Sequence, residues 1–248
     1  MRIGVTGCTG GMGTALLRHI AAHADARIAG GSEAPGHAAI GQDVGTYTGL
    51  AALNLTITGD PATVRHAALA AETKTALVAG TTGLSSGDEA TLAKAAQTTA
   101  IVYAANMSVG VNLLLAVTEQ LASQLDDAFD IEILEMHHRR KLDAPSGTAL
   151  AFGRAAAAGR GVDLDAVAER SRDGHTGARQ TGAIGFASLR GGTVAGEHTI
   201  VFAADNEQIE IIHRARNNGL FAAGALRAAL WTADKPPGLY SMKDVLGL

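Results

Sequence analysis

The chain has 248 residues, 47% of them hydrophobic, which is enough for one large domain or two modest ones with real cores. Its 20 basic and 24 acidic residues give a formal net charge of −4, which argues against nucleic acid or an anionic membrane as a partner. The single cysteine, Cys8, excludes a disulfide framework within the chain and favours a reducing compartment. The chain enters a strand pattern at once, and no apolar run reaches the roughly 18 residues that span a bilayer. We therefore expect a soluble cytoplasmic protein.

The first 107 residues alternate between short apolar runs and segments with helical spacing. Strands are expected at 2–6, 26–30, 53–58, 75–79 and 100–104, helices at 14–23, 61–71 and 86–97, and a loop at 35–52. This alternation predicts a parallel sheet with crossover helices, which is the α/β, Rossmann-like class of cofactor domain.

A glycine-rich turn joins the first predicted strand to the first predicted helix. Its residues are Gly7, Cys8, Thr9, Gly10, Gly11, Met12 and Gly13. Strand, glycine turn and helix form the context that a dinucleotide-binding loop requires, with Gly7 for the turn, Gly10 beside the pyrophosphate and Gly13 for close packing. Glu33 follows the second strand at the distance expected of an acid that binds the adenosine ribose. The alternatives are an ordinary glycine-rich turn and a solvated carboxylate, but the position of the turn favours a cofactor.

Two later loops follow predicted parallel strands and are candidates to face the same cofactor. Ligands of such sheets bind beyond the carboxyl ends of the strands. The residues concerned are Gly80, Thr81, Thr82, Ala104, Ala105, Asn106 and Met107.

After Met107 the pattern changes. Helices are expected at 109–125, 146–159 and 220–231, strands at 129–135, 183–190, 194–203 and 207–214, a polar loop at 171–177 and a short turn at 242–246. Gly191-Gly192 predicts a hairpin between the strands at 183–190 and 194–203. The region is thus expected to be an α+β domain, with a mostly antiparallel sheet and helices on one side.

These patterns predict a division into domains. Residues 1–107 are expected to bind the dinucleotide, 108–216 to bind substrate, and 217–248 to return to the first domain. Hinges are expected near 107–109 and 216–219, where the chain would cross between domains.

The stretch from Glu135 to Leu150 combines a basic run with a helix start. The basic run is His137, His138, Arg139, Arg140 and Lys141, and its mutual repulsion makes sense if an anion binds there. Pro145-Ser146-Gly147-Thr148 resembles a helix N-terminus, whose N–H groups and dipole bind carboxylate or phosphate. Acid–base groups beside an anion site indicate catalysis on a small acidic molecule.

The segment H-H-R-R-K-L-D-A-P-S-G-T-A closely resembles the signature of the 4-hydroxy-tetrahydrodipicolinate reductase (dihydrodipicolinate reductase) family. Further similar segments are the glycine loop, G-T-T-G at 80–83, A-A-N-M-S-V-G-V-N at 104–112, S-R-D-G-H-T-G at 171–177, I-G-F-A-S-L-R-G-G at 184–192 and G-E-H-T at 196–199. The resemblance implies an NAD(P)H-dependent reductase of lysine and diaminopimelate biosynthesis, acting on a small dicarboxylate. It also implies a homotetramer built through the antiparallel sheet.

The resemblance assigns roles to five residues. It implies that His137 is the acid–base residue and Lys141 the second proton donor. It also implies that His138, Gly147 and Thr148 hold the two substrate carboxylates. Alone, His137 would be better explained as a structural histidine at a strand end, but its position beside Lys141 and the anion site favours catalysis. No metal is implied.

Two departures from the family pattern bear on the cofactor domain. Many members carry Arg directly after the ribose acid, where this chain has Ala34, and Gly11 stands where some members have Arg. Without these cations a 2′-phosphate would sit near Glu33 uncompensated, which favours NADH over NADPH. The chain also lacks a strand–helix segment of longer relatives between Gly49 and Leu53, which predicts one fewer strand or a trimmed sheet edge.

Two other functions remain as alternatives. A two-domain semialdehyde dehydrogenase needs a cysteine nucleophile in its second domain, whereas Cys8 lies in the glycine loop; a sugar dehydrogenase is a related alternative. A regulatory protein that binds the cofactor without chemistry has no need of His137 and Lys141, which are both present.

Overall fold

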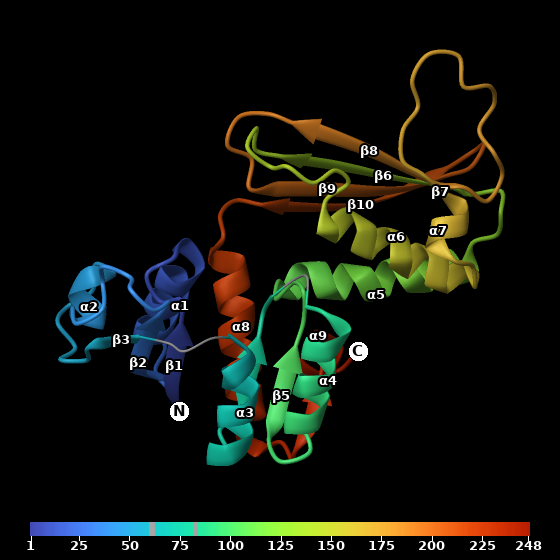
Figure 1. Ribbon diagram of the computed structural model, residues 1–248. Coiled ribbons are helices and arrows are strands. Elements are labelled where there is room, and N and C mark those ends of the chain that lie inside the picture. The colour runs from blue at the N-terminus through green and yellow to red at the C-terminus, as the bar shows by residue number, and fades with distance from the viewer. Residues whose placement is uncertain (60–62, 82–83) are drawn as a thin grey trace. The chain divides into compact units, whose positions relative to one another are not determined.

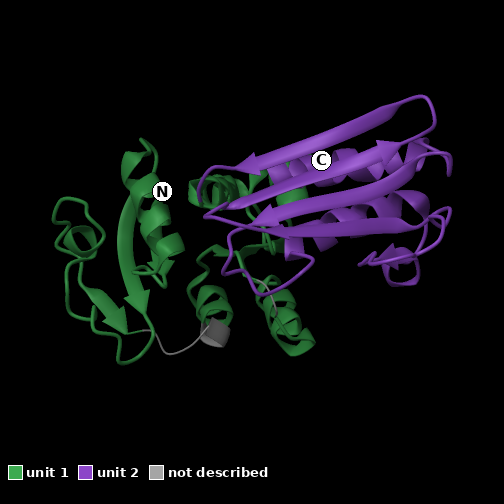
Figure 2. Ribbon diagram, turned by 90° about the horizontal axis from the view of Figure 1, so that it is seen from above, with its two compact units in different colours: residues 1–109, 218–248 green, residues 110–217 purple. Residues whose placement is uncertain are grey.

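The computed structural model describes residues 1–59, 63–81 and 84–248, so the predicted cofactor residue Thr82 lies outside the described residues. The described chain forms two compact units. The first contains Met1–Val109 and Asn218–Leu248, and the second contains Gly110–Asn217 (Figure 2). The functions assigned to the predicted domains stay predictions.

The first unit begins with a parallel sheet in the order β1 (Arg2–Thr6), β2 (Arg27–Glu33) and β3 (Ile57–Gly59). Helix α1 (Gly11–Ala22) connects β1 to β2. Its residues Leu17 and Ile20 are buried because a spacing of three places them on one face of the helix. They pack with Val5 of β1 and with Leu226 of α8 (Gly219–Trp231) in one hydrophobic core.

The strand predicted at 53–58 is wrong in its extent. β3 has three residues and lies at the sheet edge, and before it only an isolated bridge joins Asp43 to Thr56. The predicted loop at 35–52 contains the short helix α2 (Val44–Tyr47), which Asp43 caps through Thr46 N at 2.9 Å. The same carboxylate accepts hydrogen bonds from Leu53 N and Leu55 N. Asp43 thus satisfies the backbone donors that a longer strand would have paired.

A second parallel sheet of the first unit has the order β11 (Gly238–Tyr240), β5 (Ala100–Tyr103) and β4 (Leu77–Ala79). The helices of this part are α3 (Thr63–Thr73), α4 (Ser86–Ala95), the 3₁₀ turn η1 (Thr232–Asp234) and α9 (Met242–Leu246). β11 was not among the predicted strands. In the described residues no ladder joins β1 to β4, so the expected single sheet occurs as two.

The second unit contains a five-stranded mixed sheet in the order β10-β9-β6-β8-β7. Its strands are β6 (Asp130–His137), β7 (Ala168–Glu169), β8 (Ile184–Arg190), β9 (Gly196–Ala203) and β10 (Gln208–Ala215). Helices α5 (Val109–Gln124), α6 (Gly147–Arg160) and α7 (Leu164–Val167) lie on one side of it (Figure 1). The predicted fold class, a parallel-sheet cofactor unit with an α+β unit, is confirmed.

The hairpin predicted at Gly191-Gly192 is wrong. β6 lies between β8 and β9, parallel to the first and antiparallel to the second. The glycines instead carry the chain past the end of β6, where Gly191 N donates to His137 O at 2.9 Å. The hairpin of this sheet joins β9 to β10, and Ala204 N donates to Glu207 O across its turn.

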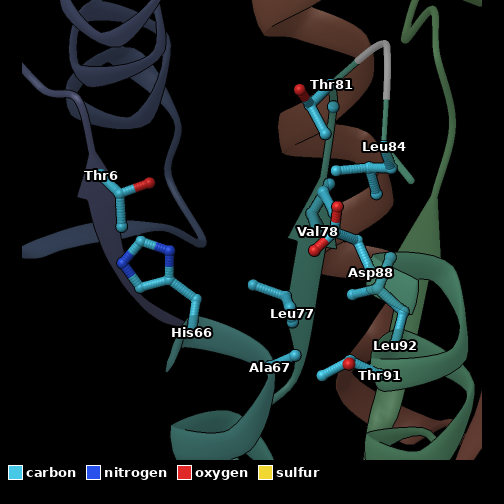
Figure 3. A pocket seen from close by; sticks show the side chains of 12 residues that line it. Thr6, His66, Ala67, Leu77, Val78, Thr81, Leu84, Asp88, Thr91 and Leu92 are labelled. Atoms are coloured by element: carbon cyan, nitrogen blue, oxygen red, sulfur yellow. The ribbon is translucent and has the colours of Figure 1, made fainter. Parts of the chain in front are cut away.

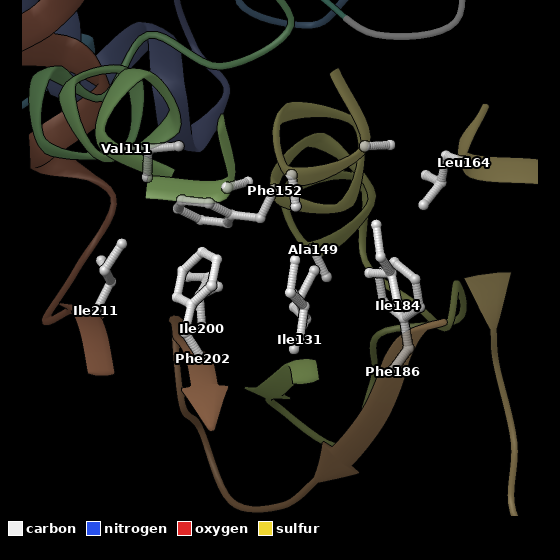
Figure 4. Packing of buried hydrophobic residues seen from close by; sticks show 14 residues of the cluster. Val111, Ile131, Ala149, Phe152, Leu164, Ile184, Phe186, Ile200, Phe202 and Ile211 are labelled. Carbon is white, nitrogen blue, oxygen red and sulfur yellow. The ribbon is translucent and has the colours of Figure 1, made fainter. Parts of the chain in front are cut away.

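Alternating residues of the central strands form the core of the second unit (Figure 4). The inward side chains are Ile131, Ile133, Ile184, Phe186, Ile200 and Phe202, which pack against Ala149 and Phe152 of α6. Burial of each large side chain is worth about 1.5–3 kcal/mol, so this core fixes the sheet against α6. None of the helices in the described ranges is long and apolar enough to cross a membrane.

Candidate active site

The predicted acid–base residue His137 is the last residue of β6. Side chains two apart on a strand share a face, so Glu135 and His137 both point toward the side covered by α6. Both are buried, with exposed fractions of 1% and 8%. His137 Nδ1 lies 2.6 Å from Glu135 Oε2. Since an ionised carboxylate only accepts, Nδ1 carries the hydrogen of this bond and Nε2 of the neutral ring keeps its lone pair.

Glu135 is the centre of a buried hydrogen-bond network. Arg190 donates to both carboxylate oxygens, at 2.7 and 2.8 Å, and Ser146 N donates to Oε1 at 3.2 Å. Burial raises the pKa of Glu135, but hydrogen bonds from Arg190, His137 and Ser188 outweigh it and lower this pKa to about 2. The carboxylate is therefore ionised at neutral pH.

A second buried histidine, His198 of β9, closes the network. Ser146 Oγ accepts a hydrogen bond from Ala149 N at 3.1 Å, so its own hydrogen can be donated to His198 Nε2, also at 3.1 Å. Burial lowers the pKa of His198 to about 4, and its ring is therefore neutral at pH 7. The rings of His137 and His198 meet edge to face, with centroids 5.2 Å apart.

The pKa of His137 reflects opposing influences. Burial lowers it, the hydrogen bond to Glu135 and the charge of that carboxylate raise it, and the charges of Lys141 and Arg190 lower it again. The net shift is downward from 6.5. On the Nε2 side, a Cβ at position 196 would lie 3.1 Å from that nitrogen, so Gly196 leaves room beside it.

The basic run after β6 folds into a turn. Lys141 N donates to His138 O at 3.1 Å, and His138 N donates to Val194 O at 2.8 Å. Lys141 Nζ forms an ion pair with Asp143 Oδ1 at 2.9 Å. Arg139 and Arg140 are exposed. Among the described residues, the buried Nδ1 of His138 has no hydrogen-bond partner.

The predicted anion site is the start of α6. Ser146 is the N-cap, and the helix runs for 14 residues from Gly147, so the positive end of its dipole lies at that residue. A Cβ at Gly147 would have nothing within 4 Å, which leaves space for a ligand against the backbone. The structure thus brings His137, His138 and Lys141 together with Gly147 and Thr148 in one unit.

The glycine turn of the first unit has the shape that a dinucleotide loop needs. Gly7 has φ of +63°, a conformation that favours glycine. A Cβ at Gly13 would lie 2.1 Å from Gly7 O, so only glycine lets α1 approach this closely. Gly10 caps α1 without a side-chain hydrogen bond, and a Cβ at Gly11 would meet nothing within 4 Å. The backbone at this helix start is accessible to a phosphate.

Two predicted cofactor residues have structural partners of their own. Cys8 is fully buried and its N–H donates to Ser32 O, so its side chain faces the core. Glu33 Oε1 accepts from Thr9 N at 2.8 Å and from Thr9 Oγ1 at 2.6 Å. These hydrogen bonds lower the pKa of Glu33, so its carboxylate is ionised at neutral pH. They also tie the glycine turn to the end of β2.

The loops after β4 and β5 lie close together. Ala104 N donates to Ala79 O at 3.1 Å, and a Cβ at Gly80 would lie 3.2 Å from the Met107 side chain. Ala105 is exposed. Asn106 Oδ1 accepts from Ser108 N at 2.8 Å. These are the contacts expected where neighbouring parallel strands end.

Gly80 and Thr81 border a pocket of about 400 Å³ (Figure 3). Thr6 of β1 and His66 of α3 also line it. The pocket thus connects the loop after β4 with the end of β1, from which the glycine turn starts. In the described parts of the chain, no three or more His, Cys, Asp or Glu residues are grouped to hold a metal ion.

Sequence reasoning missed three members of the buried network: Glu135, Arg190 and His198. One signal was present, because Glu135 occupies an inward position of an alternating strand, two residues before His137. Arg190 and His198 come from β8 and β9, and only the true strand order places them beside β6.

Comparison with known proteins identifies the family. The model for "Dihydrodipicolinate reductase, N-terminus" matches residues 1–66 and 61–107, and that for "Dihydrodipicolinate reductase, C-terminus" matches 110–246. The 4-hydroxy-tetrahydrodipicolinate reductase of Rhodopseudomonas palustris (strain BisA53) is 50% identical over 265 residues, which cover 100% of this chain and 97% of that protein. The protein of the same name from Dinoroseobacter shibae is 50% identical over 261 residues, with coverage of 98% and 97%.

A solved structure agrees in fold. The dipicolinate-bound dihydrodipicolinate reductase from Paenisporosarcina sp. TG-14 matches with a TM-score of 0.72 and 21% sequence identity, over 97% of each chain. An amine dehydrogenase from Mycobacterium smegmatis matches less well, with a TM-score of 0.58 and 12% identity. Both family models together cover nearly the whole chain. The chain belongs to the dihydrodipicolinate reductase family.

Proposed function

We propose that this protein reduces 4-hydroxy-tetrahydrodipicolinate to tetrahydrodipicolinate in lysine and diaminopimelate biosynthesis, using NADH or NADPH. Relatives named 4-hydroxy-tetrahydrodipicolinate reductase are 50% identical to this chain over 98% or more of its length. The observation that carries the proposal is the buried Glu135–His137 pair, which adjoins Lys141 and the open helix start at Gly147.

The reaction replaces a hydroxyl group by hydrogen. The substrate gains one hydride and one proton, and its 4-hydroxyl leaves as water. A bound nicotinamide supplies the hydride. The protein's own side chains handle the proton, at His137 Nε2 and Lys141 Nζ. The neutral ring of His137 can take a proton at Nε2 and return it, because Nδ1 stays bonded to Glu135.

The substrate carries two carboxylates, which need both fixed donors and cations. The start of α6 offers the backbone at Gly147 and Thr148, together with the helix dipole. His138 adds a buried ring nitrogen that has no partner among the described residues. We assign these three residues to substrate binding.

The glycine turn fits a dinucleotide. Gly7 through Met12 would hold the pyrophosphate, as the close approach at Gly13 and the start of α1, which has no side-chain cap, support. Glu33 would meet the adenosine ribose, and Gly80, Thr81 and the loop at 104–107 would line the cofactor. We propose that NADH is preferred, since Glu33 is held ionised and Ala34 brings no cation for a 2′-phosphate.

We further propose a cytoplasmic homotetramer. The face of the sheet opposite the helices exposes Leu134 (39%), Leu189 (49%) and Ile212 (42%), which a second copy could cover. Light scattering on a sizing column would measure the mass. A monomeric mass at micromolar concentration would reject the assembly and leave the activity to be judged separately.

The second candidate is a protein that binds the cofactor without chemistry. A coupled assay separates the two: substrate is generated in situ from pyruvate and aspartate semialdehyde, and cofactor oxidation is followed by absorbance. We expect turnover from the wild type, and His137→Gln or Lys141→Met should lower kcat by about 10²–10⁴ while leaving cofactor affinity unchanged. Arg154→Gln, an exposed cation on α6, is the control. No oxidation above background would favour the binding-only protein.

A further inference from the structure

We propose that Glu135 is a positioning residue, whose buried carboxylate, with Arg190 as its counter-ion, sets the tautomer of His137 and fixes the start of α6 relative to it. The inference rests on the proposed function, in which His137 moves a proton. It adds to that function a residue that touches neither substrate nor cofactor.

The first argument is the free-energy cost of burying this carboxylate. Glu135 is 1% exposed and sits in β6 beside core isoleucines. Burying an ion costs several kcal/mol unless it is paired and fully hydrogen-bonded. Oε2 accepts from His137 Nδ1 and one Arg190 nitrogen, and Oε1 accepts from the other Arg190 nitrogen and from Ser146 N. A group satisfied so completely orients whatever donates to it.

The second argument concerns the proton on His137. A carboxylate that is ionised can only accept, so the bond of 2.6 Å keeps hydrogen on Nδ1. Nε2 therefore has a lone pair in the neutral ring and an N–H in the charged ring. Nε2 is also the nitrogen that adjoins the space left by Gly196. Glu135 thus directs proton exchange to the open side of the ring.

The third argument links His137 to the anion site. Ser146 is the N-cap of α6, and its N–H donates to the same carboxylate that holds His137. Its hydroxyl bonds to His198 of β9, which adds a second tie between the helix start and the sheet. One carboxylate therefore sets both the ring and the adjacent backbone of Gly147. Misplacement of such groups by about 1 Å costs on the order of 10² in rate.

Removal of the carboxylate should change the titration of His137 in a known direction. The groups that face His137 are Glu135 on its own strand, Arg190 from β8, His198 from β9 and Lys141 from the following turn. Of these four, Glu135 is the acid. Its loss leaves burial and the positive charges, so the pKa of His137 falls further.

The test compares Glu135→Gln with a matched control, Glu132→Gln. Glu132 lies on the same strand but the opposite face, and it is likewise ion-paired, with Arg172 and Arg179 in place of the single Arg190. We expect Glu135→Gln to lower kcat by about tenfold or more with little change in the KM for NADH. The limb of the kcat–pH profile assigned to His137 should move to lower pH. Glu132→Gln should keep the wild-type profile.

A second readout does not depend on turnover. Two-bond ¹H–¹⁵N spectra of ring-labelled histidines distinguish the tautomers, and His137→Gln identifies the signal of His137. We expect the wild type to carry its proton on Nδ1 and Glu135→Gln to show a mixture or the other tautomer. If Glu135→Gln does not fold, Glu135→Asp serves: it keeps the charge but, shorter by one methylene, weakens the hydrogen bond to His137, so a smaller shift of the His137 limb in the same direction is expected.

The outcomes separate the two proposals. An inactive wild type would reject the proposed function. An active wild type whose Glu135 variants keep both the His137 limb and the tautomer would overturn the positioning role alone. A loss of activity without a shift in either readout would also overturn it, because it would assign Glu135 a merely structural role.

Discussion

Lys141 Nζ lies 2.9 Å from Asp143 Oδ1, so the proposed proton donor is ion-paired within its own turn. The pKa of Asp143 is lowered by this bond with Lys141 and, to a smaller extent, by a hydrogen bond from the backbone of Gly147. The carboxylate of Asp143 therefore uses the same kinds of donor that a substrate carboxylate needs. A partly exposed pair of this kind is worth on the order of 1 kcal/mol, so substrate can displace it.

The first prediction concerns this competition. Asp143→Asn removes the charge that competes for Lys141, so the KM for the dicarboxylate should fall by up to about fivefold, with kcat nearly unchanged. Steady-state kinetics at fixed NADH would measure both. Asp165→Asn, which breaks another exposed ion pair, with Arg170, is the control. A rise in KM would mean instead that Asp143 holds Lys141 in place for substrate.

The second prediction concerns acid stability and His198. Its pKa is about 4 in the folded protein and 6.5 in an unfolded chain, so the unfolded state binds more protons between these values. Stability should therefore be unaffected by this residue above pH 6.5 and decline as the pH falls toward 4, by about 3 kcal/mol in full. His137 and His213, whose pKa values are also lowered by burial, act in the same direction.

Urea unfolding at several pH values would measure this slope. His198→Gln should be less stable than the wild type at pH 7 but should lose less stability between pH 6.5 and 4. His175→Gln changes an exposed histidine in a loop and should keep the wild-type dependence of stability on pH. Equal slopes in the wild type and His198→Gln would contradict the prediction.

The site could be predicted from the sequence where its residues are local. The run from His137 to Thr148 lies within a dozen positions, and the cap at Ser146 follows from residue type. The glycine turn likewise follows from its place between a strand and a helix. These features need no knowledge of the tertiary structure.

The network behind His137 could not be predicted in the same way. A glycine pair between two strand patterns favours a hairpin, but the insertion of β6 between β8 and β9 depends on sheet pairing across more than fifty residues. In the predicted hairpin the strands that carry Arg190 and His198 pair with each other, and neither residue is placed beside Glu135. The predicted length of β3 was wrong for a different reason. The Asp43 carboxylate accepts hydrogen bonds from Leu53 N and Leu55 N, which a longer strand would have used for pairing with its neighbour.

The third prediction concerns the choice of nicotinamide. Thr9 holds Glu33 as an ionised carboxylate, and the next residue, Ala34, is exposed. Ala34→Arg adds a cation where a 2′-phosphate would sit and should lower the KM for NADPH relative to NADH by about tenfold. Ala34→Gln supplies a long side chain without charge and should leave the ratio unchanged. A strong preference of the wild type for NADPH would reject the premise that Glu33 disfavours the phosphate.

The fourth prediction concerns the packing of α8 on the end of β5. A Cβ at Gly224 would lie 1.7 Å from Met107 O, a backbone atom that cannot rotate away. Ala is the better helix former by about 1 kcal/mol, yet Gly224→Ala should destabilise the protein by about 1–3 kcal/mol, because the helix must move off the loop. Gly87→Ala in α4 is the matched control, since its Cβ would be 3.7 Å from the nearest atom, Ser85 Oγ, and it should be neutral or slightly stabilising. Denaturant unfolding of both variants would decide. Equal stability of the two would mean that α8 can shift at no cost, and the close approach at Met107 would then not hold the candidate cofactor loop in place.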